Sequence, residues 1–203
     1  MAFRITIGRK IGVGFGTLIF LTFIAFGLTL ITLNKSREIN DKITNLYTPS
    51  VSVLQELYIQ AVKSKMLIAN WVNIQKESED KEKLKKLIKS EYPELKKRVN
   101  ELANEWDKDD KGSIDSIFNL QDQVFSEDEY IMSQLNTFES YESIKKNDPF
   151  VWLDLRNLIE DGDSELNEKT RKILNSLSEL IDQQNEQAKQ KNKQLKVERL
   201  KVA

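Results

Sequence analysis

The 203-residue chain contains no histidine and no cysteine. Histidine is the commonest general base and metal ligand in proteins, and it is the phospho-acceptor of histidine kinases. A chain without cysteine forms neither disulfide bonds nor thiolate metal sites. These absences argue against an enzyme and against a transition-metal protein, and no cofactor is expected.

Turn-forming residues are also scarce. The sequence has 7 glycines and 3 prolines, and only Gly112 and Gly162 lie beyond residue 27. A sheet protein of this size needs many more turn formers between its strands. The composition therefore predicts an all-α fold with few, long helices.

Charge is balanced along the chain, with 31 basic and 32 acidic residues. Nucleic-acid binding proteins carry a clear basic excess on one face. Because residues 34–203 are slightly acidic, no nucleic-acid partner is expected.

One apolar segment interrupts this charged composition. Residues 11–33 contain no charged side chain, and a helix of that length spans roughly 35 Å, enough to cross a bilayer. The sequence predicts a transmembrane helix over 11–33, preceded by a cytoplasmic N-terminus over 1–10. A cleaved signal peptide is the alternative, but its apolar core is usually only about 7–15 residues long and a small-residue cleavage site follows it.

The residues that flank this segment predict its orientation in a bacterial inner (cytoplasmic) membrane. Arg4, Arg9 and Lys10 precede the segment without any acidic residue, whereas acidic side chains offset the basic ones that follow it. Basic flanks favour the cytoplasm, so the N-terminus is expected inside and the body outside, in the periplasm. Gly12 and Gly16 have the spacing of helix–helix packing sites in membranes, although glycine is also tolerated near a helix start.

Apolar residues at helical spacing predict an extracytoplasmic domain over residues 34–203. Its helices are expected at about 34–75, 78–109, 113–142 and 149–201, the last with a break near residue 162. Pro49 and Pro93 should kink their helices. A turn at 109–112 with Ser113 as the next cap is expected, and Asp148 and Pro149 have the types found at a helix N-terminus.

Two features of these helices leave alternatives open. The helix after Pro49 carries a second apolar row, which fits either a subunit interface or the centre of a monomeric bundle; its members are Ile59, Val62, Met66 and Ala69. Gln121 and Asp128 share the register of an apolar stripe, so they predict a buried polar layer that fixes helix register or binds a ligand.

Helix lengths predict how the domain meets the membrane. An unbroken helix from Pro149 to Lys201 would exceed the first helix of the domain by about 16 Å and carry basic residues into the bilayer. A start near Ser164 instead returns the last helix to the membrane surface. This geometry predicts an up-down-up-down antiparallel four-helix bundle.

The chain resembles the sensor region of bacterial methyl-accepting chemotaxis receptors and related transmembrane sensor proteins. The resemblance rests on the basic N-terminus, the Gly14-Phe15-Gly16 entry to the apolar segment, the stretch from Thr48 to Leu57 and the four-helix length pattern. It implies a homodimer that binds a small molecule or a ligand-loaded periplasmic binding protein. The family's second membrane span and output domain have no counterpart in this sequence, which favours the sensor fragment of a longer receptor over a single-pass relative.

Candidate ligand contacts are Lys63, Lys65, Trp71 and Arg156, because basic and aromatic side chains suit an anionic ligand. The alternative for each is structural, since lysine stems pack on apolar faces and tryptophan is a core residue. The acidic clusters near Asp107 and Asp161 lack the spacing of a calcium loop and are expected to be solvated turns. A different class of function is a membrane-anchored adaptor that docks a partner.

Overall fold

A computed structural model describes residues 7–73 and 79–200 of the protein. The predictions for residues 1–6, 74–78 and 201–203, including those on Arg4 and Lys201, lie outside the described residues. The described residues are helical and contain no strand, which confirms the all-α prediction. The chain forms two compact units, residues 1–45 with 187–203 and residues 46–186.

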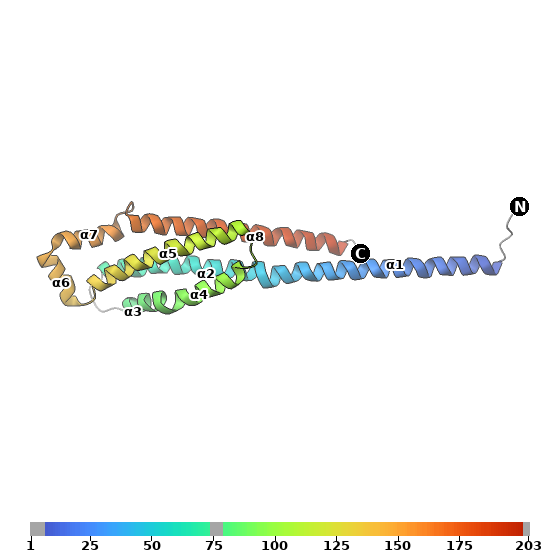
Figure 1. Ribbon diagram of the computed structural model, residues 1–203, viewed down its shortest axis with the longest axis horizontal. Helices are drawn as coiled ribbons and strands as arrows, with labels where there is room; N and C mark the ends of the chain where they lie inside the picture. The colour runs from blue at the N-terminus through green and yellow to red at the C-terminus, as the bar shows by residue number, and fades with distance from the viewer. Residues whose placement is uncertain (1–6, 74–78, 201–203) are drawn as a thin grey trace. The chain divides into compact units, whose positions relative to one another are not determined.

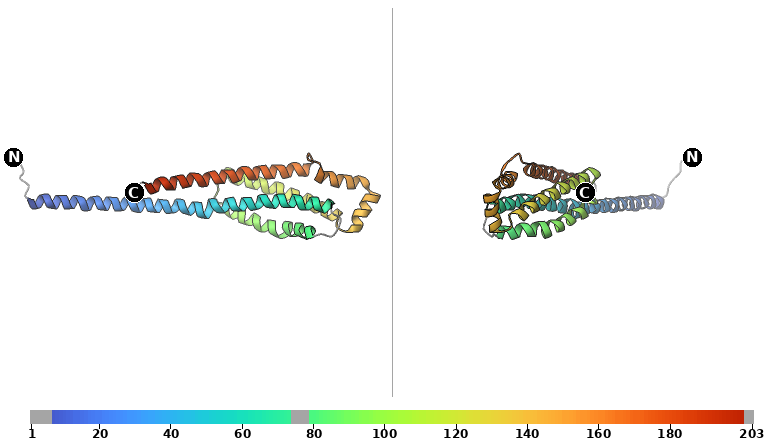
Figure 2. Two further views of the ribbon diagram at one scale, coloured as in Figure 1. Left: turned by 180° about the vertical axis from the view of Figure 1, so that it is seen from behind. Right: turned by 60° about the vertical axis from the view of Figure 1, so that its left-hand side comes forward.

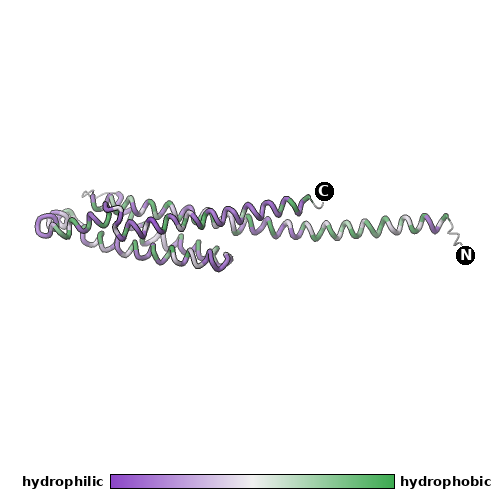
Figure 3. Tube along the Cα trace, turned by 90° about the horizontal axis from the view of Figure 1, so that it is seen from above, coloured by the Kyte–Doolittle hydropathy of each residue, from purple (hydrophilic) through white to green (hydrophobic). Residues whose placement is uncertain are grey.

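The first unit contains α1 (Ile7–Lys42) and the last turns of α8 (Glu165–Leu200). Large apolar side chains project from all sides of α1, where Phe15 is 67% and Phe23 is 71% exposed. Figure 3 shows the N-terminal part of this helix mostly in green and white. By length and composition, this is the one helix among the described residues that could cross a membrane.

The threonines of α1 satisfy their hydroxyl groups within the helix. Each hydroxyl donates to the carbonyl four residues before it, at 2.8–3.0 Å; the donors are Thr17, Thr22, Thr29 and Thr32. In lipid, a polar group without an internal partner costs several kcal/mol. The segment thus exposes apolar surface without leaving these side-chain hydroxyls unpaired.

The last turns of α8 pack beside the end of α1. Lys35 Nζ lies 3.1 Å from a carboxyl oxygen of Glu198, and Ile39 and Leu195 are buried. This contact follows directly after the apolar segment of α1.

The second unit is a helical body that extends to residue 186. Its elements are α2 (Thr48–Asn73), α3 (Glu79–Lys86), α4 (Tyr92–Ala103), α5 (Lys108–Gln134), α6 (Phe138–Asn147), α7 (Pro149–Glu160) and the first part of α8. The long helices lie side by side in both views (Figures 1 and 2). Their apolar faces form one continuous core.

Wide π-helical turns precede two prolines. The turn η1 (Ile43–Tyr47) ends two residues before Pro49, and η2 (Leu87–Glu91) ends two residues before Pro93. Proline lacks an N–H and clashes with the carbonyl four residues earlier. A wider turn before the proline accommodates it, and the chain stays helical on both sides. The chain accommodates these prolines by local widening at the places where kinks were predicted.

One helix start differs from the sequence prediction, and another agrees with it. The expected turn at 109–112 with Ser113 as cap is wrong, because α5 begins at Lys108 and includes Gly112. The side chain of Asp107 accepts a hydrogen bond from the N–H of Asp110 at 2.9 Å. Acidic residues in the first turn also stabilise the helix, because they interact favourably with the positive end of its dipole. The expected cap at Asp148 is confirmed, since its side chain accepts the N–H of Val151.

The expected helix over 113–142 is interrupted after Gln134. Thr137 caps α6 in a reciprocal pair with Ser140, and Phe138 at the start of α6 is 58% exposed. A break also separates α7 from α8 near Gly162.

Long-range contacts give the helix directions in the body. The indole of Trp106, just after α4, donates to Ser50 near the start of α2, so these helices are antiparallel. Asp110 near the start of α5 accepts from Gln184 of α8, while Lys169 near the start of α8 pairs with Glu127; α5 and α8 are therefore antiparallel too.

Candidate functional site

The four candidate ligand residues have different surroundings. Lys63 lies 3.8 Å from Glu91 of η2. Arg156 donates to Glu160 one turn later on α7. Lys65 is exposed and lines a small cavity. Lys63 and Arg156 each have an acidic partner, and a direct role of these residues in ligand binding stays a prediction.

Trp71 is a packed core residue with 1% of its surface exposed. Its indole N–H donates to the carbonyl of Leu135 at 2.8 Å, directly after α5. The hydroxyl of Tyr141 donates to the carbonyl of Trp71, and burial raises the pKa of Tyr141 to about 12, so this donor keeps its proton. A ligand would reach Trp71 only if this part of the core opened.

Lys81 belongs to the same cluster, although it lies in the charged run that the sequence places at the surface. Its side chain is buried, and its Nζ lies 4.8 Å from the ring centroids of both Trp71 and Tyr141. A desolvated cation above two aromatic rings contributes to stability. The neighbours that bury Lys81 are distant in sequence, so local periodicity did not find it.

The polar layer predicted on α5 is buried as expected. Gln121 is 2% and Asp128 is 1% exposed. Neither carboxyl oxygen of Asp128 has a hydrogen-bond partner among residues 7–73 and 79–200. Burial, with a smaller contribution from the adjacent Glu127, raises the pKa of Asp128 well above its ordinary value.

Asp128 lines a cavity of about 30 Å³ inside the body. Side chains from four helices line it: Lys65, Ile68 and Ala69 of α2, Val124 and Asp128 of α5, Ile159 of α7, and Leu166, Asn167 and Thr170 of α8. A cavity of this size holds about one or two molecules of the size of water. It is a small, mostly apolar site with one buried carboxyl group.

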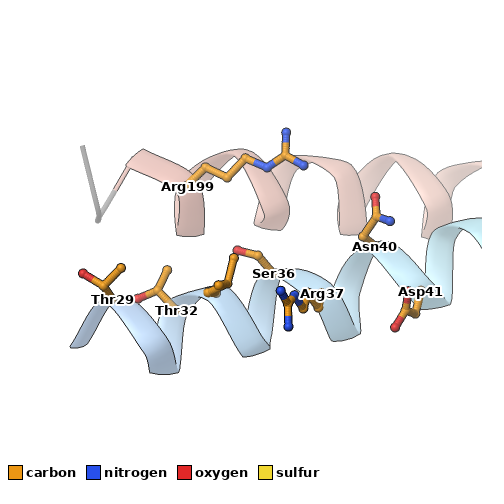
Figure 4. Close-up of a pocket in the computed structure, with 8 residues that line it drawn as sticks. Thr29, Thr32, Ser36, Arg37, Asn40, Asp41 and Arg199 are labelled. Carbon is orange, nitrogen blue, oxygen red and sulfur yellow. The ribbon is translucent and has the colours of Figure 1, made fainter. Parts of the chain in front are cut away.

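A second hollow lies along α1 in the other unit. It has a volume of about 380 Å³ and is lined by Thr29, Thr32, Leu33, Ser36, Arg37, Asn40 and Asp41 of α1 and by Arg199 of α8. Figure 4 shows Arg199 on α8 opposite the α1 turns that carry Thr32 and Ser36. The end of α8 is thus level with the end of the apolar segment.

The acidic clusters have structural roles at helix starts. Asp107 caps α5, and Asp161 accepts the N–H of Asp163 at 3.0 Å in the α7–α8 connection. In the part of the chain that the structure describes, no group of three acidic side chains is placed to hold a metal ion.

Comparison of the chain with protein-family models, with curated proteins and with solved structures gave no match. The function is therefore argued from the chain's own residues.

Proposed function

We propose that this chain is the extracytoplasmic ligand-sensing domain of a transmembrane receptor of the chemotaxis type, anchored by α1. One observation carries the proposal: α8 contacts α1 where the apolar segment ends, through Lys35 and Glu198. A small displacement of α8 at this contact would therefore change the packing of α1 at the membrane surface. Two-state helix shifts of about 1–2 Å are an established way to transmit binding.

The anchor rests on the properties of α1. Its apolar residues are exposed on all sides, and its threonine hydroxyls are satisfied inside the helix. A helix that is apolar all round is stable only when it is surrounded by apolar material. We infer a span across the inner membrane of a bacterium, with basic Arg9 and Lys10 inside.

The body would be an up-down-up-down four-helix bundle. The antiparallel contacts of α2 with α4 and of α5 with α8 support this arrangement. Ligand-binding sites in such bundles lie among side chains of facing helices, and the cavity at Asp128 has that position.

The cysteine-free sequence allows a direct test in membranes. In spheroplasts, the Lys35→Cys, Glu198→Cys double variant should be cross-linked by a short, membrane-impermeant bismaleimide added from outside. A metabolite that raises the melting temperature of the protein should change the cross-linking rate severalfold. The Lys35→Cys single variant, which offers no second thiol within the chain, is the control for non-specific reaction.

Failure of this test would separate the parts of the proposal. Cross-linking only after permeabilisation would contradict the orientation. Cross-linking that no compound in a broad metabolite library changes would contradict ligand sensing and favour the adaptor.

The exposed apolar row on α2 supports a homodimer. Ile59 is 65%, Met66 54% and Val62 44% exposed, while the opposite face of α2 is buried in the core. Apolar surface arranged in one row on a helix is typical of a packing interface. We propose that α2 pairs with α2 of a second copy.

The Met66→Cys variant tests this dimer. In membranes we expect a disulfide-linked dimer under mild oxidation, because symmetric interfaces place the same residue from two copies near the axis. The Ser116→Cys variant, on the exposed side of α5, should stay monomeric. A monomer from both variants, with another protein bound to the row, would contradict the homodimer and support the adaptor.

A further inference from the structure

Apart from the exposed Lys65, the polar residues that line the small cavity at Asp128 are Asp128, Asn167 and Thr170. The side-chain hydrogens of Thr170 and Asn167 are used elsewhere. The hydroxyl of Thr170 donates to the carbonyl of Leu166 at 2.9 Å. The amide of Asn167 donates to the carbonyls of Ile159 and Asp161 at 2.9 and 2.7 Å. What these three residues can still offer a ligand is oxygen: the hydroxyl oxygen of Thr170, the amide oxygen of Asn167 and the carboxyl group of Asp128.

This donor–acceptor balance selects the charge of the occupant. At Thr170, Asn167 and the ionised Asp128, an anion or a pure acceptor would meet oxygen atoms without available hydrogens. A cation that donates hydrogen bonds would be matched by Thr170, Asn167 and Asp128. Its charge would be balanced by Asp128, which is 1% exposed. Lys65, the one basic residue of the lining, opposes it and is exposed. The volume of about 30 Å³ limits the ligand to the size of an ammonium ion or the head of a primary amine.

We propose that the cavity binds ammonium or the ammonium head of a small primary amine, with the Asp128 carboxylate as counter-ion and Thr170 and Asn167 as neutral acceptors. The site shares only Lys65 with the candidate ligand residues inferred from the sequence, which were chosen for an anion. It goes beyond the sensor proposal and does not depend on it, because cation binding requires no membrane and no signal.

Binding would be coupled to loss of a proton from Asp128. Burial raises the pKa of the carboxyl group, so at any pH below that raised pKa the empty cavity holds the protonated form. The cation then enters and the proton leaves to solvent, so the buried charge stays balanced. The charged residues around it are Glu127 on its own helix, Lys65 of α2 in the cavity lining and Lys169 of α8, which pairs with Glu127. Lys169 is paired with Glu127 and Glu165, so Lys65 is the main unfavourable charge near the opening.

The test compares ammonium chloride with tetramethylammonium chloride at equal ionic strength, using the full chain in detergent micelles. Tetramethylammonium is too large for the cavity and has no hydrogen to donate. At about ten times its dissociation constant, ammonium should shift the unfolding equilibrium about tenfold toward the folded state. In weak buffer, binding should release up to about one proton per chain. Potassium and methylammonium chloride show whether N–H donors are needed and whether a carbon tail is accepted.

Matched variants locate the effect. Asp128→Asn should abolish both the stabilisation and the proton release, while Asp115→Asn, exposed on the same helix, should leave both intact. Thr170→Val, which preserves the side-chain shape, should weaken ammonium binding severalfold. It replaces Asp128→Asn as the test variant if Asp128→Asn does not fold. Lys65→Met should tighten binding.

Three results would overturn the proposal. The first is equal stabilisation by ammonium and tetramethylammonium in the wild type, which is expected if the cavity holds water only. The second is an ammonium effect that persists in Asp128→Asn or is unchanged in Thr170→Val. The third is stabilisation by ammonium that appears only in Lys65→Met. This result would mean that the ammonium group of Lys65 itself occupies the cavity in the wild type. Failure of the membrane cross-linking test would affect none of these measurements.

Discussion

Trp71→Ala should lower the free energy of unfolding by about 3–5 kcal/mol, as large-to-small changes of buried aromatic residues do. The side chain is 1% exposed, and its loss would leave a cavity in the core. The carbonyl of Leu135 would lose its indole donor, and Lys81 would lose one of the two rings beneath its ammonium group. Thermal and urea unfolding of the full chain in detergent micelles measure the effect.

Two variants calibrate this result. Trp71→Phe retains most of the apolar volume but leaves the Leu135 carbonyl without its donor, so a smaller loss of about 1–3 kcal/mol is expected. Trp152→Ala removes a half-buried ring that stacks edge-on with Tyr141 at 6.2 Å, and it should cost less than Trp71→Ala. If Trp71→Ala cost no more than Trp152→Ala, the core role would be contradicted, and the ligand contact predicted from the sequence would become the better explanation.

Features with a local cause were predictable from the sequence. The apolar segment of α1 follows from the absence of charge over 11–33, and the cap at Asp148 follows from its position before Pro149. The buried stripes of α4 and α5 follow from helical periodicity, because residues three, four or seven apart share one face. The same reasoning found Gln121 and Asp128 as buried polar residues, since both lie on the register of the α5 stripe.

Features with a tertiary cause were not predictable in this way. The break between α5 and α6 coincides with the Leu135 carbonyl that accepts from Trp71, 64 residues earlier. Lys81 is buried by Trp71 and Tyr141, which its own charged surroundings do not reveal. At the start of α5, Asp107 and Ser113 are both good caps by residue type, and the sequence pattern favoured the wrong one because Gly112 resembles a turn.

The candidate site also combines features with a local cause and features with a tertiary cause. The burial of Asp128 follows from its own helix, but the cavity beside it needs α2, α7 and α8. The donors of Thr170 and Asn167 are consumed by neighbouring carbonyls, and these bonds exist only once α8 is capped near Ser164. Helical periodicity therefore indicated the carboxyl group but not the cavity around it.

Asp128→Asn should remove a pH dependence of stability that the wild type shows between weakly acidic and neutral pH. In the unfolded chain the carboxyl group ionises near its ordinary pKa of 3.8, whereas in the folded protein its pKa is well above that value. The folded state therefore keeps a proton that the unfolded state has lost. Since stability rises with pH only where the unfolded state binds more protons, this group makes the folded protein less stable as pH rises above about 4.

The expected measurement is a series of urea unfolding curves from pH 4 to pH 8. The buffers contain tetramethylammonium as the only added cation, so that no small cation compensates the buried charge. The wild type should lose about 1.4 kcal/mol for each unit by which the folded pKa exceeds the unfolded one, and the loss should level off once pH exceeds the folded pKa. Asp128→Asn lacks this component, so the difference between variant and wild type should grow with pH.

The slope, not the absolute stability, is diagnostic, because the asparagine amide also brings two donors into a cavity lined by acceptors. Asp115→Asn, on the exposed side of α5, should keep the wild-type slope. Parallel slopes for Asp128→Asn and the wild type would mean that Asp128 ionises normally in the folded state, and the cavity would then already supply the compensating charge, with Lys65 the nearest source. The same pH series of the wild type with ammonium added, at unchanged ionic strength, should lose this slope. That result would connect the two properties proposed for Asp128: its carboxyl group is costly to ionise alone and is stable as the partner of a small cation.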